Sequence, residues 1–170
     1  VLSMIETAIE VTEGKVPAEV IGDLLAAGRE MLDHPIELLP HVEDVLETLR
    51  GDYRLIVVTK GDLLDQERKL AQSGLRERFD AVEIVSHKTE AAYRHIFKQH
   101  GQGAARGLMV GNSLASDVRP MIEAGGWGVY VPHDLTWAME HAKPPTNSPR
   151  FAEINDLSGL PETVKKIVSG

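Results

Sequence analysis

Polar residues that can bind an anion follow two short apolar segments of the chain. Thr59, Lys60 and Gly61 come directly after the first segment, and a hydroxyl followed by backbone N–H groups binds anions where a helix begins. Lys88 follows the second segment and directly precedes a predicted helix, where its charge opposes the helix dipole. Lys88 is therefore a candidate charge partner for a ligand. The alternatives are that Thr59 and Gly61 only form a turn and a cap, and that Lys88 is simply solvated.

A third polar cluster offers oxygen atoms that suit a divalent cation. Asn112 and Ser113 follow an apolar segment that ends at Gly111, and Asp117 is expected one helical turn further on. A carboxylate, an amide carbonyl and water molecules are ligands that Mg²⁺ accepts, so Asn112 and Asp117 are candidate metal ligands. The alternative is that Asn112 or Ser113 caps a helix and that Asp117 is a favourable acid in its first turn.

Strands and helices alternate along the part of the chain that carries these clusters. Apolar, strand-like segments are predicted near residues 55–59, 81–85, 107–111, 128–131 and 150–154. Helical periodicity separates them. Short apolar strands that alternate with helices form a parallel sheet covered on both faces. We therefore predict the α/β class with a doubly wound, Rossmann-like parallel sheet. Ligands bind beyond the carboxyl ends of the strands in such sheets, so the three clusters should meet at one edge.

Two amphipathic helical patterns precede the alternating region. One apolar stripe runs from Leu2 to Ile9 and the other from Val20 to Met31, with Pro17 between them. These patterns predict a helical hairpin whose apolar stripes pack into a core. We expect the hairpin to form a small helical segment over residues 1–36, followed by an α/β core over residues 37–170.

The order of these motifs resembles the haloacid-dehalogenase-like (HAD) hydrolase superfamily. Its second motif is a hydrophobic strand ending in Thr or Ser, as in Leu55–Thr59, and its third is a Lys before a helix, as at Lys88. Its fourth motif is an apolar strand followed by GDxxxxD or a close variant, which Leu108–Asp117 resembles with Asn112 in the first acidic place. The resemblance covers roughly residues 35–167 and identifies residues 1–36 as part of a helical cap.

The resemblance implies a Mg²⁺-dependent phosphatase of small phosphorylated molecules that works through an aspartyl-phosphate intermediate. Thr59 and the backbone N–H of Lys60 would bind phosphoryl oxygens. Lys88 would pair with the phosphoryl group and with the nucleophile. Asn112 and Asp117 would hold Mg²⁺ directly or through water, and the helical cap would select the substrate.

One motif of the family does not occur in the 170 residues: the Asp-x-Asp that supplies the nucleophile and the general acid. In the family this motif ends a strand in the middle of the sheet, between the strands that end here at Thr59 and Gly111. We expect this strand to lie upstream of Val1 or in a partner chain. Where this strand is missing, Val57 and Met109 should be separated by two strand spacings, ~10 Å.

Two other functions fit the same residues. A haloacid dehalogenase would use the same nucleophile on a C–Cl bond without a metal, and the neutral Asn112 gives this interpretation some support, although the spacing to Asp117 favours the metal-dependent branch. A non-catalytic relative would bind a phosphorylated metabolite or a protein partner. An esterase is disfavoured because the chain has no G-x-S-x-G turn.

Composition excludes several other classes. The chain is 42% hydrophobic and 26% charged, as expected for a globular protein, and its net charge of −8 disfavours nucleic acid as a partner. No apolar stretch approaches the roughly 20 residues that span a bilayer, so no membrane partner is expected. The absence of cysteine excludes disulfides and fits a cytoplasmic protein. The 7 histidines form no paired metal motif.

Overall fold

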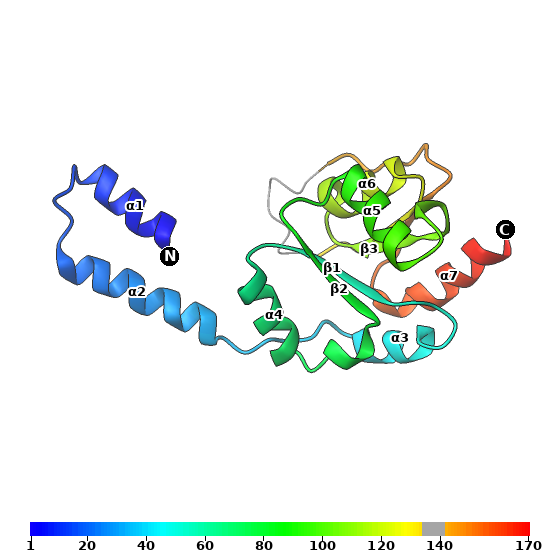
Figure 1. Ribbon diagram of the computed structural model, residues 1–170, viewed down its shortest axis with the longest axis horizontal. Coiled ribbons are helices and arrows are strands. Elements are labelled where there is room, and N and C mark those ends of the chain that lie inside the picture. The colour runs from blue at the N-terminus through cyan, green and yellow to red at the C-terminus, as the bar shows by residue number, and fades with distance from the viewer. Residues whose placement is uncertain (134–141) are drawn as a thin grey trace. The chain divides into compact units, whose positions relative to one another are not determined.

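The computed structural model describes residues 1–133 and 142–170 (Figure 1). Two compact units divide the chain, Val1–Glu37 and Leu38–Gly170. The helices are α1 (Leu2–Val11), α2 (Ala18–Asp33), α3 (Val42–Leu49), α4 (Leu63–Gln72), α5 (Glu90–His100), α6 (Arg119–Glu123) and α7 (Leu160–Ser169). The strands are β1 (Ile56–Lys60), β2 (Ala81–Val85), β3 (Leu108–Gly111), β4 (Trp127–Tyr130) and β5 (Phe151–Glu153). None of the helices in these residues has both the length and the apolar character that crossing a membrane requires.

The first unit is a hairpin of α1 and α2. The helices approach closely where Val1 meets Gly28, since a Cβ built on Gly28 would lie 2.1 Å from Val1 Cγ2. Gly28 is the one buried residue of α2, and α1 has none. The prediction that the two apolar stripes pack into a core is therefore wrong for most of their residues: Leu2 is 78% and Met31 71% exposed. Two short helices cover only one side of each other, so most of their apolar surface faces outward.

Parallel strands form the framework of the second unit. β1 pairs with β2 so that Thr59 lies beside Ile84, and β3, β4 and β5 form a second group in that order. All of these pairs are parallel. This confirms the predicted α/β class with a parallel sheet.

Helices cover both faces of the strands. One core cluster joins Val129 of β4 to residues of α3 and α7, and Leu108 and Val110 of β3 pack against it. The other joins Tyr93 of α5 to Met121 of α6, and Met109 packs there. Neighbouring residues of β3 thus point to opposite helical layers, as alternation along a strand requires. Figure 1 shows α5 and α6 on one side of the strands and α3 and α7 on the other.

β1 and β3 each pair with a single strand in the part of the chain that the structure describes. Among the strands in the described residues, β1 pairs only with β2, β3 pairs only with β4, and no ladder joins β1 to β3. Val58 of β1 and Met109 of β3 nevertheless pack against the same cluster of α5 and α6. Two groups of strands therefore share one helical layer while each presents an edge without a strand partner, which is the arrangement expected if a central strand lies between them.

Candidate active site

The carboxyl ends of the strands carry a buried ion pair. Lys88 follows β2, and its Nζ lies 2.6 Å from Oδ1 of Asp117, which follows β3. The side chains are only 12% and 5% exposed. Thr89, the next residue, is the N-cap of α5, and its Oγ1 accepts the Ala92 N–H. The short distance and the burial make this a strong, charge-assisted hydrogen bond.

Asp117 is held on its other side by the turn in which it lies. Its Oδ2 accepts the Ser113 N–H at 3.0 Å, and Ser113 Oγ accepts the Ser116 N–H at 2.9 Å. We expected Asp117 one turn inside an α-helix, but Leu114–Val118 forms a single π-helical turn and α6 begins only at Arg119. Such π turns are rare and concentrate at functional sites.

Thr59 and Lys60 end β1 beside the end of β2. The Thr59 hydroxyl is half-buried and donates to Gln66 Oε1 at 2.7 Å. Gln66 lies in α4, which Asp62 caps by accepting the Asp65 N–H. The Lys60 side chain is exposed. The anion-binding role predicted for Thr59 and Lys60 stays a prediction.

Comparison with known proteins identifies the family. A family model described as haloacid dehalogenase-like hydrolase matches residues 4–125. The chain belongs to this family of hydrolases. A haloacid dehalogenase-like family hydrolase from Xanthomonas campestris, whose crystal structure is known, shares 40% sequence identity with this chain. The two structures superpose with a TM-score of 0.84, and the match covers 97% of this chain and 70% of that one. The superfamily resemblance seen in the motifs is thus confirmed.

Two further relatives have activities in their names. The pyrimidine 5'-nucleotidase YjjG of Escherichia coli is 30% identical over 93 residues, which is 51% of this chain and 41% of the nucleotidase. The 2-haloacid dehalogenase of Pseudomonas syringae is 21% identical with a TM-score of 0.62, covering 91% of this chain and 66% of that one. The dehalogenase therefore shares the fold, and this chain spans less than half the length of the nucleotidase.

The two candidate metal ligands of the family's fourth motif lie in different surroundings. Asp117 is buried against Lys88, whereas the Asn112 side chain at the strand tip is exposed. In residues 1–133 and 142–170 no three His, Cys, Asp or Glu side chains converge on a metal site. Asn112 and Asp117 offer oxygen donors of the kind that Mg²⁺ prefers, but the remaining ligands would have to be water or side chains beyond this group. Metal binding by these two residues stays a prediction.

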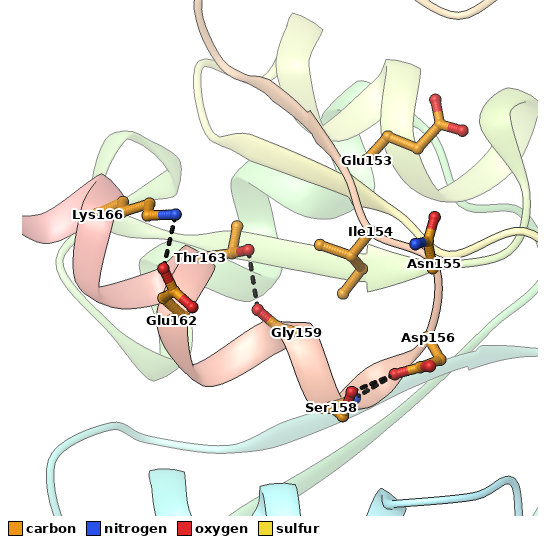
Figure 2. A pocket seen from close by; sticks show the side chains of 9 residues that line it. All are labelled: Glu153, Ile154, Asn155, Asp156, Ser158, Gly159, Glu162, Thr163 and Lys166. Carbon is orange, nitrogen blue, oxygen red and sulfur yellow. Dashed lines mark hydrogen bonds and ion pairs between the residues drawn. The ribbon is translucent and has the colours of Figure 1, made fainter.

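A cavity elsewhere at the sheet contains none of the predicted site residues. It has a volume of about 340 Å³ and lies between the end of β5 and the start of α7. Several of the interactions around it are local, as Figure 2 shows: Lys166 pairs with Glu162 at 2.7 Å, and Asp156 accepts the Ser158 N–H at 2.8 Å. The site at Lys88 and Asp117 is thus a separate feature.

Two residues that contact the site were missed in the sequence. Gln66 accepts the Thr59 hydroxyl, and the buried Tyr93 donates its hydroxyl to the Ser116 carbonyl oxygen at 3.1 Å. Tyr93 lies on α5, the helix that follows Lys88. Its place on the inner face of a predicted helix was a usable signal for burial, but no local pattern showed which backbone group its hydroxyl would meet.

Gly111 leaves the space that the Asp117 carboxylate occupies. A Cβ built on Gly111 would lie 2.1 Å from Asp117 Oδ2. We expect Gly111→Ala to displace this carboxylate and to lower the free energy of unfolding by about 1–3 kcal/mol, as overpacking does. Urea denaturation of the full-length protein measures the change.

Gly159→Ala is the matched control for this experiment. Gly159 has a φ of −76°, and a Cβ there would meet Ile154 at 3.5 Å, an ordinary contact. The control should change the free energy of unfolding by less than about 1 kcal/mol. Equal stability of the two alanine variants would show that Asp117 tolerates a side chain at position 111.

Proposed function

We propose that the complete protein is a Mg²⁺-dependent phosphatase of small phosphorylated molecules. The observation that carries this proposal is the Lys88 ammonium group, which pairs with Asp117 at 2.6 Å at the carboxyl ends of the strands, in a side chain only 12% exposed. Membership of a hydrolase family and the similarity to a nucleotidase support it. A buried cation at a ligand-binding edge of the sheet is suited to neutralising the charge of a phosphoryl group.

The reaction proposed here uses a nucleophile outside these 170 residues. An aspartate oxygen attacks phosphorus, the bond from phosphorus to the leaving oxygen breaks, and a general acid protonates that oxygen. Water then attacks the acyl phosphate and releases inorganic phosphate, which regenerates the aspartate. Both steps require the attacking and leaving groups to lie in line with phosphorus. Both also require the negative charge on the three equatorial oxygens to be neutralised.

The residues of this chain would bind and orient the phosphoryl group. The Thr59 hydroxyl has one proton, which it donates to Gln66, so binding a phosphoryl oxygen requires that hydroxyl to rotate away from Gln66. The backbone N–H of Lys60 would assist. An ammonium group has three donors. The bond from Lys88 to Asp117 uses one, and the other two would serve the phosphoryl group and the nucleophile.

A bound Mg²⁺ would add positive charge beside the phosphoryl oxygens. Asn112 would offer its exposed side-chain carbonyl, and Asp117 its carboxylate, directly or through water. Because Lys88 and the Ser113 N–H already bind the Asp117 oxygens, a water-mediated role suits Asp117 best.

The test is phosphate release by the full-length protein from a panel of phosphomonoesters, with Mg²⁺ and with EDTA. The panel should include pyrimidine nucleoside monophosphates, because the similar nucleotidase is named for them. We expect release that depends on Mg²⁺ and is abolished by EDTA. Binding of phosphomonoesters without turnover would instead support the non-catalytic alternative.

A haloacid dehalogenase is the second candidate. It is favoured by the neutral Asn112 and by the pairing of Asp117 with Lys88, which balances the carboxylate charge without a metal. Halide release from a 2-haloacid in EDTA, together with no phosphate release, would replace the phosphatase proposal by this one.

A further inference from the structure

Tyr93 is a buried polar residue that the proposed reaction does not use. It lies on α5 with 0% of its surface exposed, in a cluster with Ala104, Met121 and Ala124. Its hydroxyl donates to the Ser116 carbonyl oxygen at 3.1 Å. Burial, and secondarily the negative charge of Asp117, raises the pKa of the Tyr93 hydroxyl far above its usual range, so it stays protonated and able to donate.

The Ser116 carbonyl that Tyr93 binds lies in the π-helical turn that also carries Asp117. In an α-helix a carbonyl accepts the N–H of the residue four positions later. That residue is Pro120, which has no N–H. The Tyr93 hydroxyl therefore supplies a side-chain donor to a carbonyl whose α-helical partner position is occupied by a proline.

Helix α5 and the residue before its cap hold the π-helical turn at two points. Lys88 binds the Asp117 carboxylate, and Tyr93 binds the carbonyl of the preceding residue, Ser116. Ser116 in turn donates its N–H to Ser113 Oγ, and the Ser113 N–H binds Asp117. A continuous set of hydrogen bonds therefore runs from the Tyr93 hydroxyl to the carboxylate that faces Lys88.

We propose that Tyr93 is a positioning residue, whose hydroxyl fixes the Leu114–Val118 turn and thereby places the Asp117 carboxylate against Lys88. The consequence for catalysis rests on the proposed function, but the consequence for the turn does not. Tyr93 itself need not touch substrate or metal for this role.

Tyr93→Phe in the full-length protein tests the proposal, because it keeps the ring and removes only the hydroxyl. Without metal or substrate, we expect hydrogen exchange of the Ser113 and Asp117 amides to become about fivefold to tenfold faster, in line with the net worth of one hydrogen bond. Exchange of the Val129 amide in β4 should not change. In phosphate release, kcat should fall by a similar factor with little change in KM for the phosphomonoester.

Tyr53→Phe is the control, since Tyr53 lies before β1 at the amino ends of the strands and packs against the other core cluster. It should leave exchange at Ser113 and Asp117 as in the original protein. Equal acceleration of Ser113, Asp117 and Val129 exchange in Tyr93→Phe would show a general loss of stability and would overturn the proposal, as would unchanged exchange in the turn. Because exchange is measured without turnover, the outcome stands even if the protein releases no phosphate.

Discussion

Replacing Lys88 by Met in the full-length protein is expected to lower phosphate release by about two to three orders of magnitude, as the loss of an electrostatic donor does. The free energy of unfolding should fall by about 3–5 kcal/mol, because the change leaves the buried Asp117 carboxylate without its charge partner. Lys88 and Asp117 are 2.6 Å apart and only 12% and 5% exposed, so solvent does little to screen this loss. Steady-state kinetics and urea denaturation measure the two effects.

Lys166→Met is the matched control. Lys166 pairs with Glu162 at 2.7 Å, almost the same distance, but both side chains are 74% exposed. Water screens such a pair and its contribution is small, so neither activity nor the unfolding midpoint should change measurably. A similar loss in both lysine variants would mean that burial is not what gives Lys88 its effect.

A double variant separates stability from activity. Asp117→Asn removes the buried negative charge and keeps an oxygen that can accept the Ser113 N–H. Lys88→Met/Asp117→Asn should therefore recover part of the stability lost in Lys88→Met while phosphate release stays low.

Asp117→Asn and Asp117→Ala alone should each cost about two orders of magnitude in Mg²⁺-dependent turnover. Full activity of Asp117→Ala would reduce Asp117 to a structural acid.

The second large effect concerns the edges of β1 and β3 that pair with no strand among residues 1–133 and 142–170. Alternate residues of a parallel strand bond to opposite neighbours. Because the Gly61 N–H donates to Val85 of β2, the Val58 N–H points to the opposite edge of β1. The Gly107 carbonyl accepts the Trp127 N–H, so Gly107 faces β4. Val110 lies three residues later on the opposite alternation, and its N–H therefore points to the edge of β3 away from β4. These two amides report on any strand between β1 and β3.

We expect a parallel strand to lie between β1 and β3 in the full-length protein and to protect the Val58 and Val110 amides from hydrogen exchange. Residues 1–170 alone should not fold cooperatively, since each buried backbone group without a partner costs on the order of 1–3 kcal/mol and a whole domain is stable by only about 5–15 kcal/mol. Thermal unfolding and amide exchange of both proteins measure this.

Thr59 and Met109 serve as internal references for that exchange experiment. By the same alternation their N–H groups point toward β2 and β4. They should be protected in the full-length protein whether or not a further strand is present. Rapid exchange at Val58 and Val110 beside slow exchange at Thr59 and Met109 in the full-length protein would contradict the central strand. So would cooperative unfolding of residues 1–170 alone.

Local patterns in the sequence determined the α/β class and the edge at which the polar residues gather. Apolar runs ending at Thr59, Val85 and Gly111 became parallel strands, because burial on both faces selects continuous apolar residues. Parallel strands end on one side, so the positions of Lys88 and Asp117 at the same edge followed from the pattern. Each of these features depends on a few neighbouring residues, which is why periodicity sufficed.

Only the tertiary structure decided which side chains meet. Asp117 binds Lys88 and the Ser113 N–H, Thr59 binds Gln66, and Tyr93 reaches the Ser116 carbonyl. Most of these contacts join different helices and strands, so their distances depend on how α4, α5 and the π-helical turn pack. Tertiary packing likewise left the stripes of α1 and α2 largely exposed, since amphipathic periodicity shows that a helix has an apolar face but not which surface covers it.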